Sequence, residues 1–417
     1  MRETGTEVLV VGAGPVGLWT AILLAEAGIE VSIIDREVRT AARSYACGIH
    51  PRTLQSLAGV GMADAVLERG RRIHRFAFWD RKAFQAELKF SELNSTYPFL
   101  LILPQSALES LLEQRLQKAG INVHWNHRFA SFVEEEECVA ATVEELAGTS
   151  TGYIVPHWEM VVKDRAQVRT QFLIGADGHG SLVRQVAGLN YQRVGDAEFF
   201  AAFEFESSDP VEDEVRVVLD ETTDVLWPLP DGKCRWTFQL LRHELAAEFP
   251  EKERRAVRLA QPQVDERIRQ YVEKVSTHRA PWFTAHVQNI SWCSEVAFER
   301  RLAKPSGQNR YWLLGDAAHQ TGPVGIQSVN SGFAEAEGLV SRLKKILHEG
   351  GKLQVLQAHN QEHEKRWNQL MGLTGGLKAR ADTNSWVRAN CAKLMPCLPG
   401  FDAELTKLAN LLGLDLA

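Results

Sequence analysis

The sequence predicts an α/β fold with two different sheets and a helical C-terminal tail. Residues 8–11 form a β-branched run, 18–27 are apolar with helical spacing, and 31–34 form a second β-branched run, so together they indicate one βαβ unit. From about Tyr191, short strand-like segments separated by turns rich in Asp and Gly predict an antiparallel sheet. Residues 353–417 have a helical pattern with breaks at glycine and proline.

A glycine-rich turn joins the first strand to the first helix. Gly12, Gly14 and Gly17 form the pattern G-x-G-x-x-G. Gly12 permits a tight turn, Gly14 leaves room for the backbone to approach a pyrophosphate, and Gly17 lets the helix pack closely on the sheet. Asp35 follows about 20 residues later, where a carboxylate can accept hydrogen bonds from ribose hydroxyls. This combination predicts a Rossmann-like dinucleotide site, but it does not distinguish NAD from FAD.

The other elements follow from periodicity and from glycine and proline positions. The first half of the chain is expected to hold a helix from Pro51 to Gly59 or Gly61, a strand or hairpin at 76–90, a helix that opens within 103–109 and ends at Gly120, a short strand at 121–125, and strands at 153–162 and 168–174. The second half is expected to hold strands at 199–205, 215–219, 223–227 and 234–240, a charged helix at 251–275, and strands at 296–301 and 311–314. The acidic run 134–137 is expected to be a solvated turn, and the basic run 69–75 either a solvated face or a nicotinamide-phosphate contact.

Composition excludes several classes of function. The 417 residues are 45% hydrophobic and 24% charged, as in an ordinary globular protein, and the net charge of −6 gives no reason to expect nucleic acid. No apolar run approaches the ~18 residues of a membrane span, and the short polar start predicts no signal peptide. The six cysteines have no C-x-x-C pair, so neither a metal site nor a disulfide scaffold is expected. We therefore expect a cytoplasmic protein that acts on a small molecule.

Two further glycine-marked turns follow apolar strands, at 175–178 and at 315–319. With Gly12 to Gly17, these turns appear in the order found in the class A flavoprotein monooxygenases, and over roughly its first 345 residues the chain resembles this para-hydroxybenzoate hydroxylase-like family. By this resemblance, the first turn is the ADP-binding motif. The second, with Ser181 and Arg184, is associated with both FAD and NAD(P)H. In the third, Asp316 holds the ribityl chain of FAD.

The segment after the third motif adds a physical argument. Residues 323–330 precede an expected helix at 331–347, whose free amides and positive dipole end can face the anionic edge of a reduced isoalloxazine. The family often has glycine where this chain has Ile326 and Ser328, so a stiffer loop is expected. His319 is equally consistent with a packed histidine and with one that touches flavin or substrate.

The resemblance and the residues together give the candidate site. It implies that Arg43 and Gln105 contact the pyrophosphate and the flavin side of the cofactor. The expected cofactor contacts are Gly12, Gly14, Pro15, Val16, Gly17, Asp35, Arg36, Arg43, Gln105, Asp177, Gly178, Gly315, Asp316, Pro323, Gly325, Ile326, Gln327 and Ser328. The expected substrate contacts are Trp227, Pro228, Phe238 and Pro323. No catalytic side chain is assigned; His50, Tyr45 and His319 are candidates for a base.

The resemblance also implies how the chain is divided. The Rossmann-like FAD-binding domain is expected in three segments, 1–75, 101–190 and 296–346. The antiparallel-sheet substrate domain is expected at 76–100 and 191–295, and a C-terminal helical region at 347–417. The C-terminal region is expected to pack on the FAD-binding domain or on another subunit.

The implied function is hydroxylation of an electron-rich aromatic or polycyclic small molecule. In this family NAD(P)H reduces FAD, O₂ adds to give a C4a-hydroperoxide, and its distal oxygen attacks the substrate. The nicotinamide binds without its own Rossmann domain, so NADH and NADPH are not distinguished. A halogenase, an epoxidase, a reductase and a non-catalytic FAD-binding protein remain as alternatives, although the W-x-W-x-I-P motif of halogenases is absent.

Overall fold

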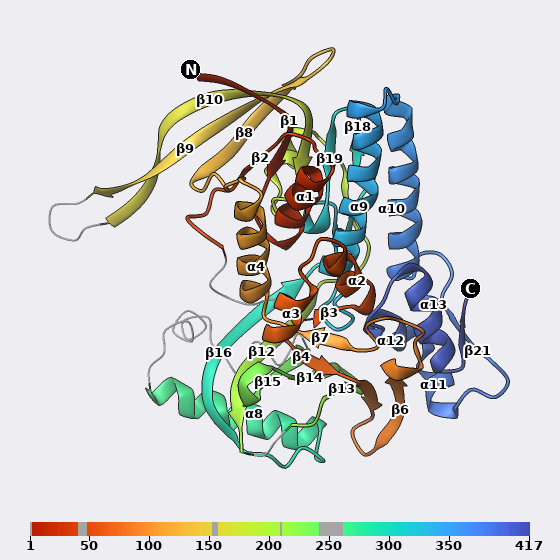
Figure 1. Cartoon of the computed structure of the whole chain (residues 1–417). Helices are drawn as coiled ribbons and strands as arrows, with labels where there is room; N and C mark the ends of the chain where they lie inside the picture. Colours follow the sequence, from red (N-terminus) through yellow and green to blue (C-terminus); the bar gives the residue numbers. More distant parts are fainter. Residues whose placement is uncertain (1, 41–47, 152–156, 209–210, 242–261) are drawn as a thin grey trace.

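The computed structural model describes residues 2–40, 48–151, 157–208, 211–241 and 262–417. A sheet that contains the N-terminal strand lies at one end of the molecule and a second sheet at the other, with long helices beside the first (Figure 1). The expected α/β fold with an antiparallel sheet and C-terminal helices is therefore confirmed.

The first sheet is parallel at its centre and carries the βαβ unit. Its parallel strands lie in the order β19 (Tyr311–Leu313), β10 (His157–Gly175), β1 (Arg2–Val11) and β2 (Val31–Ile34). It is extended at its edges by the antiparallel strands β18 (Gly307–Gln308), β9 (Val139–Thr151) and β8 (His127–Glu134). The acidic run lies between β8 and β9, as expected for a turn.

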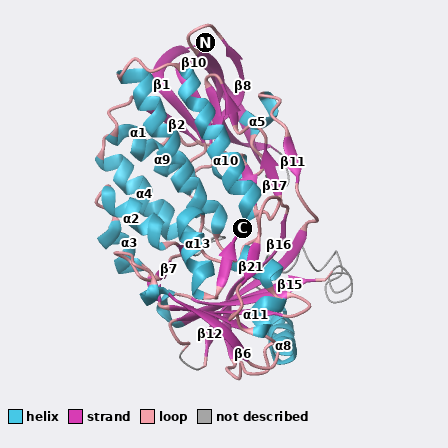
Figure 2. Cartoon of the chain, turned by 90° about the vertical axis from the view of Figure 1, so that its right-hand side faces the viewer, coloured by secondary structure: helices cyan, strands magenta, loops and turns pink. Residues whose placement is uncertain are grey.

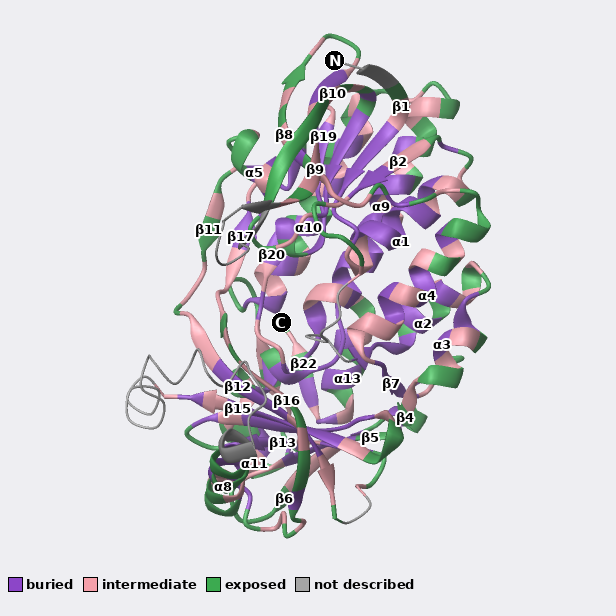
Figure 3. Ribbon diagram, turned by 90° about the vertical axis from the view of Figure 1, so that its left-hand side faces the viewer, coloured by how far each residue is buried: buried purple, intermediate pink, exposed green. Residues whose placement is uncertain are grey.

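Helices α1 (Pro15–Glu26), α4 (Gln105–Lys118) and α9 (Gln327–His348) lie beside this sheet (Figure 2). Pro15 occupies the first turn of α1, where its missing N–H costs nothing, and Gly28, with φ +75°, follows its end. The ring of Trp19 stacks on Phe333 of α9 at 5.1 Å. Figure 3 shows much of α1 and α9 as buried, and within β1 the residues Val8 to Val10 are wholly inaccessible to solvent.

The second sheet crosses the far end of the molecule. Its strands lie in the order β16 (Val287–Phe298), β12 (Glu198–Ser207), β15 (Lys233–Leu240), β14 (Thr223–Pro228), β13 (Glu214–Leu219), β5 (Arg75–Trp79) and β6 (Phe84–Lys89). All neighbours are antiparallel except β13 and β5, which are parallel. One face packs on α8 (Pro262–Arg279) through Ile268, Tyr271 and Val272, and the other lies toward the first sheet and its helices (Figure 1).

Smaller elements connect these two layers. They are α2 (Pro51–Gly59), α3 (Ala63–Arg69), α5 (Leu182–Val186), the sheet of β3 (Gly48–Ile49), β7 (Leu100–Ile102) and β4 (Arg71–Ile73), and the sheet of β11 (Tyr191–Arg193), β17 (Arg301–Ala303) and β20 (His319–Gln320). Short 3₁₀ turns occur at Phe90–Glu92, Pro230–Gly232, Gly315–Ala317, Leu353–Leu356 and Met395–Cys397.

Four element predictions need correction. Residues 157–175 form one long strand instead of two, because β9 pairs with it across a single irregularity at Val162 and Asp164. Residues 121–125 form only one isolated bridge, between His124 and Ile34. Strand β16 begins earlier than expected, and α9 begins at Gln327, not Ser331, so the residues expected to precede the helix form its first turn. The expected helix at 251–275 is described from Pro262, and its earlier residues lie outside the described chain.

The C-terminal region packs behind the third glycine-marked turn. It contains α10 (Gln357–Leu370), β21 (Leu377–Ala379), α11 (Ser385–Ala389), α12 (Cys391–Leu394), α13 (Asp402–Leu411) and β22 (Leu414–Leu416). Trp367, Leu398 and Phe401 share one buried apolar cluster with Val324 and Ile326, so this region packs on the loop between the third glycine-marked turn and α9. Among the helices that the structure describes, none has the length and apolar character needed to cross a membrane.

Candidate functional site

One cavity of about 450 Å³ reaches from the first glycine turn to the second sheet. Its lining includes residues from all three glycine-marked turns and aromatic residues from the sheet. Of the expected cofactor contacts, those that line it are Gly12, Gly14, Pro15, Val16, Asp35, Arg36, Gln105, Asp177, Gly178, Asp316, Pro323, Ile326, Gln327 and Ser328. Residues distant in the chain thus surround one space, within the size range of ligand sites.

The first turn is shaped by the absence of side chains. A Cβ atom on Gly12, which has φ +106°, would lie 2.3 Å from the carbonyl oxygen of Ala176, so the turn requires glycine. On Gly17 a Cβ would lie 1.9 Å from the carbonyl oxygen of Gly12, which explains the close approach of α1. Gly14 has no neighbour within 4 Å of such a position. Its backbone is therefore open to the cavity at the N-terminus of α1, where helix amides attract anions.

Asp35 closes the first turn as well as lining the cavity. Its Oδ2 accepts a hydrogen bond from the amide of Ala13 at 2.6 Å, and its Oδ1 accepts one from the amide of Glu37 at 2.8 Å. A carboxylate offers about four acceptor positions, so it retains acceptor capacity toward the cavity.

The second turn is held by Asp177 and Arg184. Oδ2 of Asp177 accepts from the amides of Leu182 and Val183 at 2.7 and 3.2 Å, whereas its buried Oδ1 has no partner among the described residues. Burial raises the pKa of this carboxyl above its usual value. The guanidinium of Arg184 donates to the carbonyl oxygen of Ala317 at 2.8 Å, and thereby ties the second motif to the third.

The third turn places Asp316 at the mouth of the cavity beside the first turn of α9. The hydroxyl of Ser328 donates to Oδ1 of Asp316, and its oxygen lies 3.4 Å from Nδ1 of His319. Because α9 begins at Gln327, its free N-terminal amides lie at the cavity wall. Ile326 precedes the helix with φ +49°, a conformation that costs an L-residue roughly 1–2 kcal/mol. This strain lies where the family often has glycine.

Two expected contacts pack behind the wall instead. A Cβ on Gly315 would meet the side chain of Val16 at 3.0 Å, and one on Gly325 would meet the carbonyl oxygen of Pro396 at 2.7 Å. Like Gly17, they shape the turns without being part of the cavity lining. Arg43 and Tyr45 lie outside the described residues.

The second sheet contributes an apolar and aromatic wall. Its residues at the cavity are Phe200, Ala202, Trp227, Arg235, Thr237, Trp292, Val296 and Phe298. Arg235 is buried, donates from Nε to Oε1 of Glu204 at 2.9 Å, and lies 5.3 Å from the ring centre of Trp292. A compensated cation thus lies within a mainly apolar surface.

Phe238, an expected substrate contact, lies on the opposite face of the sheet from the cavity. Successive residues of a strand point to opposite faces, and Arg235 and Thr237 point to the cavity. Phe238 stacks on Trp236 at 5.0 Å in the cluster on the opposite face, under α8. Pro228 is likewise not part of the lining, because it pairs with Cys234 of that opposite cluster, whereas Trp227 pairs with Arg235.

The two described candidates for a base are wholly buried. His50 has no exposed side-chain surface, and its Nε2 donates to the carbonyl oxygen of Gly325 at 3.0 Å. Burial lowers the pKa of His50 to about 3. His319 lies behind Ser328, with Nε2 2.8 Å from Glu335. The structure therefore favours the packed interpretation of His319.

The basic run is mostly occupied by contacts with the second sheet and its flanking residues. Arg71 donates from Nε to Asp213 at 2.8 Å, and Arg75 is ion-paired with Glu212 at 3.0 Å and with Glu214 at 3.1 Å. These contacts join β4 and β5 to the segment before and at β13. They give the run a structural role between the two layers.

Sequence reasoning missed other lining residues. His127, Arg128 and Phe129 reach the cavity from the start of β8, and Gln320, Thr321 and Gly322 from the segment after β20. No periodicity or motif in the sequence marks these residues as lining a cavity. They are brought to it by the pairing of β8 with β9 and of β20 with β17.

Comparison with known proteins agrees with this geometry. The FAD binding domain family matches residues 5–374. The 6-methylpretetramide 4-monooxygenase of Streptomyces rimosus is 29% identical over 376 residues, which cover 89% of this chain and 61% of that protein. The para-nitrophenol 4-monooxygenase of Pseudomonas sp. strain WBC-3 is 26% identical over 381 residues, which cover 87% of this chain and 84% of that protein.

A solved structure shows the same fold over nearly the whole chain. The p-nitrophenol 4-monooxygenase from Pseudomonas putida DLL-E4 superposes with a TM-score of 0.71 at 19% identity, covering 99% of this chain and 95% of that one. The family match extends over most of the described residues and includes all three glycine-marked turns. The chain therefore belongs to the FAD binding domain family, within the class A FAD-dependent monooxygenases.

Proposed function

We propose that this protein is an FAD-dependent, NAD(P)H-using monooxygenase that hydroxylates an electron-rich aromatic or polycyclic small molecule. The observation that carries the proposal is one continuous cavity, lined at one end by the glycine turns and at the other by the aromatic face of the second sheet. A dinucleotide cofactor and an aromatic compound can therefore meet in one space. The relatives named for 6-methylpretetramide and para-nitrophenol support this substrate class.

The residues present fit FAD. The open backbone at Gly14 suits the pyrophosphate, and Asp35 at the end of β2 suits the adenosine ribose. The unpartnered Oδ1 of Asp177 and the carboxylate of Asp316 supply acceptors for ribityl hydroxyls. The N-terminus of α9 supplies a positive dipole for the isoalloxazine.

The wall around Trp227 and Phe298 then holds the substrate. Aromatic and aliphatic side chains exclude water and orient a planar ring, which is the main contribution of the protein when a cofactor carries the chemistry. When bound, FAD reduced by NAD(P)H would activate O₂, so that one oxygen atom enters the substrate and the other leaves as water. Arg235 and Thr237 on this wall can form hydrogen bonds with polar substituents of the substrate.

The test is anaerobic reduction of the flavin by NADH and by NADPH, with and without a panel of phenolic and polycyclic aromatic compounds. Reduction accelerated by one compound, followed by transfer of one ¹⁸O atom from ¹⁸O₂ to that compound, would establish a hydroxylase and select the nicotinamide. Absence of reduction under every condition would contradict the proposal. It would favour a halogenase supplied by a separate reductase, or a non-catalytic FAD-binding protein.

A further inference from the structure

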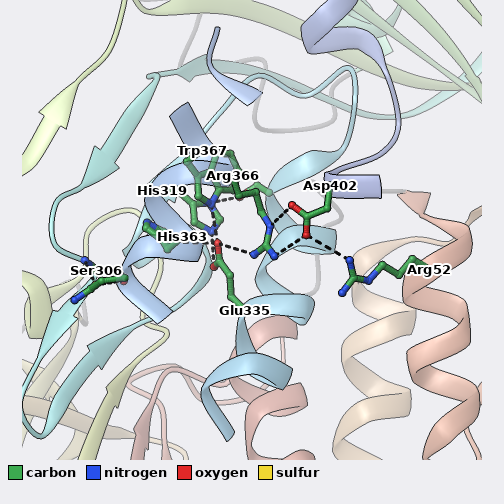
Figure 4. Close-up of polar contacts among 10 residues, drawn as sticks. Arg52, Ser306, His319, Glu335, His363, Arg366, Trp367 and Asp402 are labelled. Atoms are coloured by element: carbon green, nitrogen blue, oxygen red, sulfur yellow. Dashed lines mark hydrogen bonds and ion pairs between the residues drawn. The ribbon is translucent and has the colours of Figure 1, made fainter. Parts of the chain in front are cut away.

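A buried polar cluster lies directly behind the third glycine-marked turn (Figure 4). The side chains of His319 and Glu335 have no exposed surface, and Nε2 of His319 lies 2.8 Å from Oε2 of Glu335. The other oxygen of Glu335 accepts from Nε1 of Trp367 at 2.6 Å and contacts Nδ1 of His363 at 3.2 Å. The rings of His319 and Trp367 stack at 3.8 Å. The cluster therefore joins β20, α9 and α10.

Hydrogen bonds connect this cluster to the third turn. The hydroxyl of Ser328 donates to the carboxylate of Asp316, and its oxygen lies 3.4 Å from Nδ1 of His319. Nε2 on the other side of the same ring faces the carboxylate of Glu335. Although burial acts to raise it, His319 and His363 hold the pKa of Glu335 well below its usual value. A buried histidine–carboxylate contact thus lies beside the cavity.

The pair is anchored to the C-terminal region. Arg366 lies 4.0 Å from Oε1 of Glu335, and its Nε and Nη2 donate to Asp402 at 3.0 and 2.7 Å. Arg52 of α2 lies 3.4 Å from the same aspartate (Figure 4). A buried carboxylate is costly to desolvate unless donors surround it, and His319, His363 and Trp367 all lie against the two oxygens of Glu335.

We propose that Glu335 is a positioning residue for the cofactor site: through the ring of His319 it fixes Ser328, which in turn holds the Asp316 carboxylate in its FAD-binding orientation. This inference rests on the proposed FAD contact of Asp316. It assigns to α10 an indirect part in cofactor binding, although none of its described residues lines the cavity.

The test is a double-mutant cycle on the FAD dissociation constant, measured by titrating apoprotein and following flavin fluorescence. We expect Glu335→Gln and Ser328→Ala each to weaken FAD binding by about tenfold, and the double variant to be no weaker than the weaker single variant, because residues in one hydrogen-bond network are coupled. Glu337→Gln, a half-exposed position on the same helix, is the matched control and should leave the constant unchanged.

A purely structural role of Glu335 gives a different pattern. A structural role predicts a lower melting temperature, and the effects of the two substitutions on FAD affinity would then add in the double variant. That additive result would overturn the inference. Unchanged FAD affinity in Ser328→Ala would overturn it as well. Ser328→Thr retains the hydroxyl and should restore binding, so the Ala and Thr pair tests the inference even if Glu335→Gln does not fold. Because the measurement is FAD affinity, the absence of hydroxylation would refute the proposed activity alone.

Discussion

The pH dependence of stability should reveal a second buried contact behind the cofactor loop. Glu404 of α13 has a side chain that is 11% exposed, and its Oε2 lies 3.9 Å from Nδ1 of the buried His50. Neither atom has a hydrogen-bond partner among the described residues. Burial raises the pKa of Glu404 from 4.5 to about 7. We predict that Glu404→Gln, which is neutral at every pH, stabilises the protein at pH 8.

The direction of the pH dependence of stability follows from proton binding to Glu404. Between pH 4.5 and about 7 the folded protein holds a proton on Glu404 that the unfolded chain releases, so the free energy of unfolding falls as the pH rises through this window. A difference of about 2.5 pKa units, at 1.36 kcal/mol per unit, corresponds to about 3 kcal/mol. The stabilisation by Glu404→Gln should therefore approach this value at pH 8 and decrease toward pH 5.

Urea unfolding with saturating FAD, followed by tryptophan fluorescence at pH 5, 6, 7 and 8, would measure this difference. The lowered pKa of His50 makes the free energy of unfolding fall below about pH 6.5. This contribution is the same in the wild type and in Glu404→Gln, so it cancels in the difference between their free energies of unfolding. Glu337→Gln makes the same charge change at a half-exposed site and should show no such trend. A difference between Glu404→Gln and the wild type that is constant with pH, or that grows toward acid, would refute the reasoning.

Two further predictions concern the cavity. Gly12→Ala should abolish flavin absorbance in the purified protein, because its Cβ would lie 2.3 Å from the carbonyl oxygen of Ala176. Gly28→Ala, whose Cβ would have no neighbour within 4 Å, is the control and should retain flavin. Retained flavin in Gly12→Ala would contradict the assigned turn. Phe238→Ala should lower the free energy of unfolding by about 3–5 kcal/mol and leave the substrate KM unchanged, whereas its neighbour Thr237→Val should change KM with little loss of stability. The opposite pattern would show that the assignment of the two sheet faces is reversed.

Much of the cofactor end of the site was predictable because it depends on local backbone geometry. Gly12 must adopt positive φ, Gly17 must admit a neighbouring carbonyl oxygen, and both requirements are visible in the spacing of three glycines between a strand and a helix. The strand that ends at Gly175 and the helix before Gly28 were equally recognisable. Residues 8–35 contain all the information for the first unit.

The substrate end was less predictable for a definite reason. Alternation identifies the buried face of a strand only when the other face meets water. Here one face of β15 lies under α8 and the other faces the cavity, so Trp236, Thr237 and Phe238 are all buried. Nothing in the sequence distinguishes the two sides, and for this reason Phe238 was assigned to the wrong one.

The βαβ unit and the three glycine-marked turns in their order can be read from the sequence, because each depends on residues close together in the chain. The tertiary structure sets which side of the second sheet faces the cavity, and it brings the C-terminal helices against the loop at Ile326. It also decided the partner of His319, because Glu335 and Trp367 reach it through the packing of α9 on α10. Contacts of this kind depend on how elements pack, and packing leaves no periodic signal in the sequence.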